Sequence, residues 1–189
     1  LLVRIKNLKM KRKTALFTFA IAAVLLLGSF MPVNKSKFPK QRAFLLVSGK
    51  PVFEGSSSDG GYKVTLIYLN RAIDSVTLTD NKTFEFNLEK NVIYSVRIEK
   101  AGFLPKLISI NTKMPELYKE HILYKFQFEV EMYANNLKQF LDADDVDFPV
   151  AVVSYDEKAD MYDYSRKYTE CVIQRFDEAR KADGGIVAQ

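Results

Sequence analysis

The feature that most constrains this chain is a strict two-residue alternation of apolar and polar side chains between Thr79 and Phe103. The segment reads TDNKTFEFNLEKNVIYSVRIEKAGF. Successive side chains of a β-strand point to opposite faces of a sheet, so this pattern predicts strands with one buried face and one wet face. The polar turns DNKT and EKN bound the strands. The predicted inward-facing residues are Phe84, Phe86, Leu88, Tyr94, Val96 and Ile98.

The same alternation recurs on both sides of this segment. About seven strands over about 90 residues, with no helical period between them, favour an antiparallel sandwich over a parallel sheet. We therefore predict a mainly β fold whose sandwich is formed by residues 44–133. The predicted strands lie in LLVSGKPVFE (broken by Gly49 and Pro51), YKVTLIYLN, RAIDSVTLTD, FEFNLE, VIYSVRIEK, KLISIN and YKFQFEVEMY.

Residues 134–189 follow another pattern and form a predicted C-terminal extension. The apolar run from Val150 to Tyr155 predicts an extra edge strand. From about residue 157 to 181 apolar side chains recur every three or four positions, which predicts an amphipathic helix capped by Asp156 and ended by DGG at 183–185. Cys171 flanks the apolar stripe and is predicted to be a small buried side chain. The stripe consists of Met161, Tyr164, Tyr168, Val172 and Phe176.

The N-terminal residues 1–31 have the pattern of a signal peptide or membrane anchor for export. A basic stretch, Lys11 to Lys13, precedes an apolar run from Ala15 to Leu27. Thirteen apolar residues match the core of a signal peptide and are short for a spanning helix, which needs about 20 residues. The pattern fits a cleaved secretory signal, an uncleaved inner-membrane anchor or a buried core helix; in the first two, the rest of the chain is exported. Met10 suggests that residues 1–9 lie upstream of the true start, and residues 32–43 are a predicted linker.

The charge distribution argues against nucleic-acid binding. The net charge is +5, but six basic residues and no acidic ones lie within the first 13 positions, which leaves 22 basic against 23 acidic residues elsewhere. No basic patch interleaved with aromatic residues remains.

One cysteine and one histidine are too few for a Cys/His zinc site or an intrachain disulfide. We therefore expect no cofactor and no metal.

The segment from Phe84 to Phe103 resembles the carboxypeptidase regulatory-like domain. That family often has F-x-F, then Y-x-[LV]-x-[VI], then G-[FY]; here these are Phe84 and Phe86, Tyr94 to Ile98, and Gly102 with Phe103. Asn81 and Lys82 stand where the family usually has glycine. The resemblance, which covers residues 45 to about 133, implies a seven-stranded prealbumin-like (transthyretin-like, Greek-key) sandwich. It also implies a non-catalytic module of an exported bacterial envelope protein.

Several groups of residues are candidate sites. Asp142, Asp144, Asp145 and Asp147 offer oxygen ligands for calcium, but without EF-hand spacing they also fit a solvated loop or a helix cap. Ser56, Ser57 and Ser58 with His121 lack a G-x-S-x-G context, and no carboxylate pair is marked for glycoside hydrolysis. Tyrosine favours partly solvent-exposed surfaces such as protein interfaces and sugar-binding faces, so Tyr155 and Tyr162 are the candidate interaction surface.

Together these observations predict a protein that is not an enzyme. The expected function is protein–protein interaction or structural support at the cell envelope, through a sheet edge or the C-terminal helix. The alternative is a module that binds carbohydrate or another surface ligand. The expected partner is another envelope protein, or a glycan in the alternative; the expected location is the periplasm, the outer membrane or cell surface, or the periplasmic face of the inner membrane.

Overall fold

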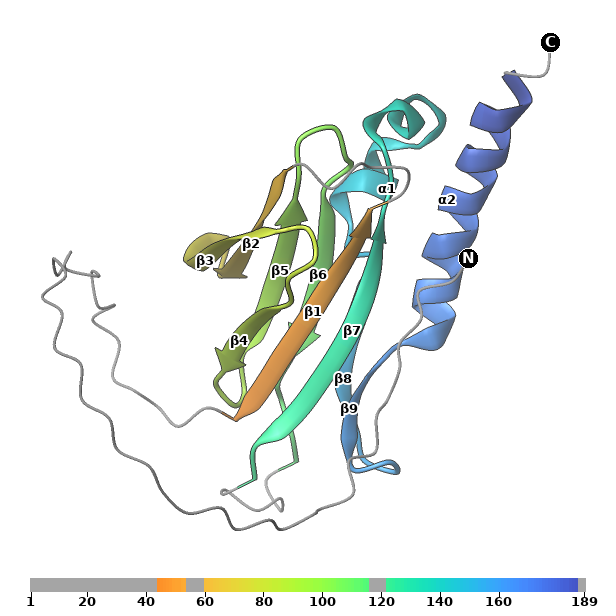
Figure 1. Cartoon of the computed structure of the whole chain (residues 1–189). Coiled ribbons are helices and arrows are strands. Elements are labelled where there is room, and N and C mark those ends of the chain that lie inside the picture. Colours follow the sequence, from red (N-terminus) through yellow and green to blue (C-terminus); the bar gives the residue numbers. More distant parts are fainter. Residues whose placement is uncertain (1–43, 54–59, 116–121, 187–189) are drawn as a thin grey trace, which may run out of the picture. The chain divides into compact units, whose positions relative to one another are not determined.

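The computed structural model describes residues 44–53, 60–115 and 122–186 (Figure 1). The predicted signal or anchor segment and the linker, residues 1–43, lie outside these ranges. No helix in the described ranges is both long and apolar enough to cross a membrane. In chain order the elements are β1 (Leu45–Phe53), β2 (Gly61–Tyr68), β3 (Arg71–Thr79), β4 (Phe84–Leu88), β5 (Ile93–Glu99), β6 (Lys106–Asn111), β7 (Tyr124–Met132), the 3-10 helix η1 (Asn135–Phe140), α1 (Ala143–Asp147), β8 (Ala151–Asp156), β9 (Met161–Tyr164) and α2 (Arg166–Ile186).

The described strands form two sheets that pack as a sandwich. The smaller sheet has three strands in the order β4-β1-β7, and the larger has six in the order β3-β2-β5-β6-β8-β9. β1 pairs in parallel with β7, and β6 in parallel with β8; the remaining pairs are antiparallel. A mainly β sandwich with a C-terminal helix is confirmed, whereas seven antiparallel strands become nine mixed ones. Alternation reports which face is buried and carries no information on strand direction.

The predicted alternation holds through the centre of the core. Each of the six side chains predicted to face inward from β4 and β5 is at most 5% exposed. The same is true of Phe126, Phe128, Val130 and Met132 on β7, whose outward neighbours include the exposed Glu129. β3 differs because it lies at the end of the larger sheet, and its side chains are exposed or half-buried.

β1 runs without a break through Gly49 and Pro51, where the sequence predicted an interruption. A Cβ atom at Gly49 would clash with the ring of Phe84 and lie 2.7 Å from the ring of Phe128, so glycine lets both rings pack over the strand. The pairing with β4 ends at Gly49. Pro51 therefore lies where one side of β1 is unpaired, and proline is tolerated there because a donor is dispensable.

Residues beyond 133 complete the larger sheet. β8 is the predicted extra strand, but β9 covers its outer side, so it is not an edge. β9 replaces the first turns of the predicted helix 157–181, which begins instead at Arg166. Asp156 therefore caps no helix: its carboxylate accepts the backbone N–H groups of Lys158 and Ala159, at 2.9 and 3.3 Å, in the β8–β9 turn.

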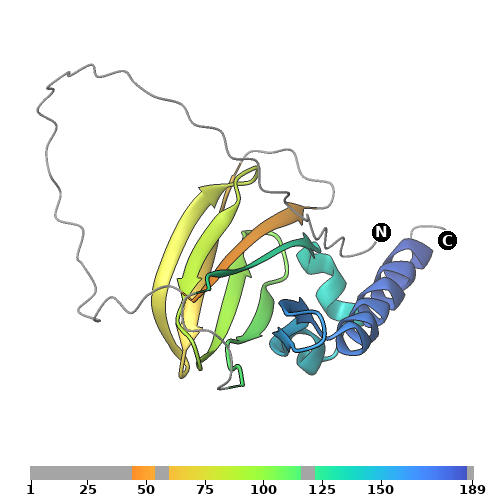
Figure 2. The same cartoon turned by 90° about the horizontal axis from the view of Figure 1, so that it is seen from below.

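α2 lies beside the sandwich next to η1 and β8 (Figure 2). Val172, Phe176 and Ala179 form its buried stripe, as the helical spacing predicts for Val172 and Phe176. Cys171 is exposed, which corrects the prediction that it is buried. The helix also continues through the DGG sequence to Ile186 rather than ending there.

Candidate functional site

Tyr162, one of the two residues predicted to form an interaction surface, lies in the core. It is 1% exposed, and its hydroxyl donates a hydrogen bond to the carbonyl oxygen of Thr112 at 3.1 Å. Burial raises its pKa above the ordinary value for tyrosine. The prediction is wrong for this residue, because β9 is a strand whose inward side chains point between the sheets.

Tyr155 faces Tyr162 across the β8–β9 pair and is half-buried. Its hydroxyl donates to Oδ1 of Asp160 at 2.6 Å, and the hydroxyl of Tyr124 donates to the same oxygen at 3.2 Å. The rings of Phe44, Tyr124, Tyr155 and Tyr162 lie 5.5–6.2 Å apart in edge-on or tilted contacts. The structure thus brings the two predicted tyrosines together in an aromatic cluster that joins β7 to the β8–β9 pair.

The acidic segment 142–147 forms the start and body of α1. The backbone N–H of Asp142 donates to Oδ2 of Asp145 at 3.2 Å, which is one half of a capping box. Asp145 is 7% exposed and forms an ion pair with Arg175 on α2. Within the described ranges no three His, Cys, Asp or Glu side chains are grouped to hold a metal ion. The segment therefore caps α1 and connects α1 to α2 through an ion pair.

The candidate residues His121 and Ser56–Ser58 lie outside the described residues.

Lys106 is a buried cationic residue that the sequence analysis missed, although it alternates in phase with the buried Ile108 and Ile110. It is 2% exposed. Its Nζ atom lies 3.1 Å from the ring centroid of Phe176 on α2 and 4.5 Å from that of Tyr133. The two rings are stacked, with centroids 5.1 Å apart and planes at 14°. The lysine therefore links the larger sheet to the helix through cation–π contacts.

The environment of Lys106 disfavours its charge. Burial lowers its pKa well below the ordinary value, and the Glu131 carboxylate opposes this shift only partly. Glu131 also accepts a hydrogen bond from the Tyr133 hydroxyl at 3.3 Å. A lysine with a lowered pKa can serve as a nucleophile or base. Lys106 lines two small cavities, of about 20 and 60 Å³, and its Nζ atom lies against the rings of Tyr133 and Phe176. We therefore assign Lys106 to helix docking.

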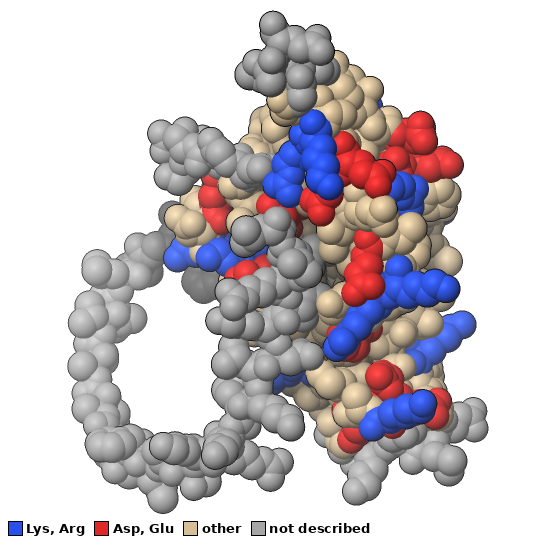
Figure 3. Space-filling view, turned by 90° about the vertical axis from the view of Figure 1, so that its right-hand side faces the viewer, with Lys and Arg blue, Asp and Glu red and all other residues tan. Residues whose placement is uncertain are grey.

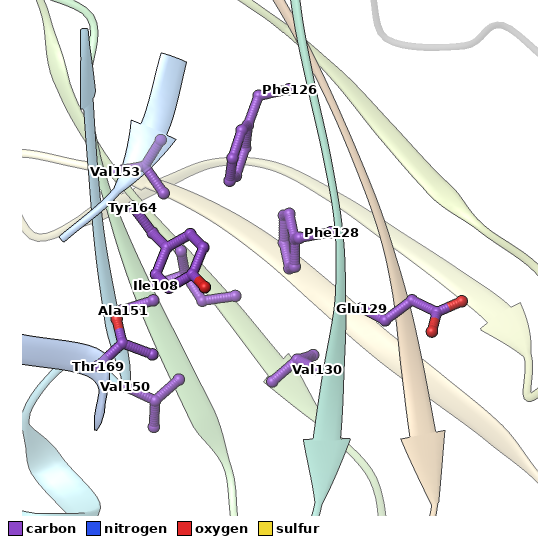
Figure 4. A pocket seen from close by; sticks show the side chains of 10 residues that line it. All are labelled: Ile108, Phe126, Phe128, Glu129, Val130, Val150, Ala151, Val153, Tyr164 and Thr169. Atoms are coloured by element: carbon purple, nitrogen blue, oxygen red, sulfur yellow. The ribbon is translucent and has the colours of Figure 1, made fainter. Parts of the chain in front are cut away.

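A second cavity of about 20 Å³ lies between β7 and the β8–β9 pair (Figure 4). Apolar side chains such as Phe126, Phe128 and Val153 line it, and the Glu129 carboxylate points away from it. Thr169 contributes a buried hydroxyl that has no hydrogen-bond partner in the described part of the chain. Tyr164 also lines the cavity, and the cavity volume leaves room for about one water molecule. This cavity is a packing gap of the core.

Phe148 is the second residue that the sequence analysis did not single out. It follows α1 and is 57% exposed. Among the described aromatic residues, only Tyr68 and Phe148 are classed as exposed. Nothing in the local alternation marks Phe148, because it lies between Asp147 and Pro149 and outside both periodic patterns.

The backbone around Phe148 is held from several sides. Its own N–H donates to the carbonyl of Asp144 at 3.0 Å. The next carbonyl, that of Pro149, accepts the hydroxyl of Tyr168 from α2 at 2.6 Å. The N–H of Val150 donates to the carbonyl of Leu107 on β6 at 2.7 Å. Because α1 is also tied to α2 by the Asp145–Arg175 pair, the exposed ring is carried on a fixed backbone.

A small polar pocket lies next to the segment that precedes Phe148, because Val146 and Asp147 line it. It encloses about 60 Å³ and is lined by Arg97, Pro105, Lys106, Leu107, Val146 and Asp147. The Arg97 side chain is 48% exposed and pairs with Glu99 through Nε at 2.9 Å. We call Phe148 together with this pocket the Phe148 surface. Phe148 does not line the pocket itself, but it directly follows Asp147, which does. Protein interfaces are enriched in aromatic residues such as Phe148 and in arginine.

The face that carries α2 has a mixed charge (Figure 3). Basic and acidic side chains intermingle on it, and Gln174 Nε2 donates to Glu178 Oε1 at 2.9 Å along the helix. Nucleic-acid binding requires a surface of predominantly positive charge. The described residues of this face do not form such a surface.

The comparisons with known proteins assign no family to the chain. No protein-family model matches it, and no curated protein sequence matches it. Among solved structures it is distantly similar to a chain in the crystal structure of a type II cohesin–X–dockerin complex from Acetivibrio cellulolyticus. The identity is 19% and the TM-score 0.32, and the match covers 47% of this chain and 57% of that chain. No function is transferred from this distant likeness.

Proposed function

We propose that this protein is an exported, non-catalytic module of the bacterial cell envelope that binds another envelope protein through the Phe148 surface. The observation that carries the proposal is Phe148 itself: an aromatic ring that is 57% exposed on a backbone fixed to α1, α2 and β6. Exposed apolar rings contribute strongly to binding when a partner buries them. A backbone fixed in advance lowers the conformational entropy lost on binding.

The sizes of the cavities support a non-catalytic role. Those described above hold about 20 to 60 Å³, whereas sites for small molecules usually enclose about 300 Å³ or more. Lys106 has a strongly lowered pKa, as catalytic lysines often do. Its Nζ atom, however, lies against the rings of Tyr133 and Phe176, where it joins the helix to the sheet.

The arrangement of aromatic side chains favours a protein partner over a glycan. Sugar binding uses a row of exposed rings on one face, but the two exposed described rings lie on different elements. Tyr68 ends β2, and Phe148 follows α1. One row of outward-facing positions crosses β2, β5, β6 and β8. It contains no aromatic residue; its members are Ile67, Ser95, Ser109 and Val152.

The proposed export and family rest on the sequence. The basic and apolar pattern of residues 11–27 supports export. The carboxypeptidase regulatory-like assignment is supported by the resemblance of Phe84, Phe86 and Tyr94 to the family pattern. Gly102 adds to this support because its φ of +83° suits glycine, and it places Phe103 5.1 Å from the ring of Phe53.

Photo-crosslinking in cells tests the proposal. A photoreactive phenylalanine analogue is placed at Phe148 of the full chain, and at Val52, which is 45% exposed on β1, as the matched control. We expect one discrete cross-linked product with another envelope protein from position 148 and none from position 52. Products of equal yield from both positions, or none from 148, would refute binding through this surface.

A further inference from the structure

In the described part of the chain, β3 is an end strand of the larger sheet and lies apart in sequence from the Phe148 surface. In the described ranges, the strands at the sheet ends are β3, β4, β7 and β9. β4 has five residues and β9 has four, and β7 carries Lys125, Glu129 and Glu131 along its length. β3 has nine residues, pairs with β2 alone among the described strands, and carries only exposed or half-buried side chains. Long unpaired edges invite pairing with another strand.

The two halves of β3 differ in their protection. The first half contains Arg71 and Asp74 and lies opposite an irregularity between Leu66 and Ile67 of β2. Charges and bulges are devices that discourage edge pairing. The second half, Ser75 to Thr79, pairs residue for residue with β2 and contains no charge, proline or glycine. As far as the chain is described, this five-residue half presents a regular open ladder of backbone donors and acceptors.

The sequence of this half, SVTLT, is chemically symmetric about Thr77. In an antiparallel pair centred on Thr77, Ser75 faces Thr79 of the second copy, and Val76 faces Leu78. The hydroxyl residues then meet on the outer face, and the apolar residues meet on the inner face, where Val76 and Leu78 are now half-buried. Cross-strand hydroxyl pairs and cross-strand apolar pairs both stabilise a sheet.

We propose that two copies of this chain associate through β3 in this register, which joins their larger sheets into one continuous sheet across a two-fold axis at Thr77. The symmetric pattern favours a second copy over an unrelated peptide, because a two-fold interface requires a patch that complements itself. Beyond the five residues Asp74 would face Asp80 of the other copy, so the pairing stops at Thr79. The proposal is independent of the Phe148 surface.

Disulfide cross-linking of full-length protein tests the register. In a Cys171→Ser background, which removes the exposed native thiol, Thr77→Cys places two thiols opposite each other. Opposed residues of an antiparallel pair have Cα atoms about 4.5–5.5 Å apart, within the reach of a disulfide. Ser75→Cys is the matched control: its two copies lie four residues apart along the strands, roughly 13 Å, beyond disulfide reach.

We expect a covalent dimer from Thr77→Cys on mild oxidation, and little from Ser75→Cys. In sedimentation equilibrium of the full chain in a mild detergent, we expect twice the monomer mass, and at least about tenfold weaker association for Thr77→Lys, which opposes two charges at the axis. Circular dichroism confirms that each variant is folded. A wild-type monomer at all accessible concentrations, or equal cross-linking from positions 75 and 77, would overturn the proposal.

Discussion

Replacing Lys106 with methionine should stabilise the fold and remove a pH dependence of its stability. Lys106 is 2% exposed between the rings of Phe176 and Tyr133, and burial lowers its pKa well below the ordinary value. Methionine has a similar unbranched shape and needs no hydration. Cation–π attraction of about 2 kcal/mol offsets part of the desolvation cost in the wild type. We expect a net gain of about 1–3 kcal/mol at neutral pH, in line with replacements of buried ionic groups by apolar ones.

The sign of the pH effect follows from proton binding. Between the lowered pKa of the folded state and the ordinary value near 10.4, the unfolded chain binds the Lys106 proton and the folded chain does not. Wild-type stability should therefore rise with pH in this window, by at most about 1.4 kcal/mol per pH unit from this group. Below the folded-state pKa both states are protonated, and this contribution becomes flat. The advantage of Lys106→Met should shrink as the pH approaches 10.

Urea unfolding followed by far-UV circular dichroism, at one-unit steps from pH 6 to 10, measures both effects. Lys125→Met, a change at an exposed lysine on β7, is the matched control and should alter stability by no more than about 0.5 kcal/mol. If the wild-type and Lys106→Met stabilities stay parallel across this range, or if the variant is less stable throughout, the account of Lys106 as a lysine disfavoured by burial is refuted.

Three further changes probe the core. Gly49→Ala should cost about 1–3 kcal/mol in urea unfolding, because its Cβ would press on Phe84 and Phe128; an unchanged midpoint would contradict the packing of β1. Thr169→Val should stabilise by about 1 kcal/mol, because it removes a buried hydroxyl without a partner in the described structure, and a loss of stability would show that the hydroxyl is satisfied. Burial, with Asp80 nearby, raises the pKa of Tyr62 to about 12, so stability should fall as the pH rises from 10 to 12 while only the unfolded tyrosine ionises. Tyr62→Phe should make this fall smaller, and an equally steep fall in the variant would contradict the assignment.

The strand alternation was sufficient to predict most of the core because it records local burial directly. Phe84, Phe86 and Phe128 are buried as expected. The direction and order of strands depend on long-range pairing, which is why the parallel β1–β7 pair was not predicted. β1 was expected to break at Gly49 because the sequence does not show the two phenylalanine rings that need the space of a missing side chain.

The C-terminal region shows the limit of periodicity over short segments. Met161 and Tyr164 fit the three-to-four spacing of the helix that follows, yet four residues also suffice for a strand once β8 offers a partner. Tyr162 does not belong to the apolar stripe of the predicted helix and was predicted at the surface, but as part of β9 it is buried. Lys106 was detectable in principle, since it alternates in phase with Ile108. The rigidity around Phe148 comes from contacts with α2 and β6, which no local pattern encodes.

The most direct test of the proposed function is to measure how much of its partner the protein recovers when Phe148 is changed. Full-length wild type, Phe148→Ser and Leu123→Ser are each purified from cross-linked envelopes, and the co-purified protein is quantified by mass spectrometry. Leu123 is 46% exposed and supplies a matched loss of exposed apolar surface away from α1. We predict that wild type and Leu123→Ser recover the same partner in equal amounts, and Phe148→Ser at least about tenfold less. Equal recovery by all three would contradict the account.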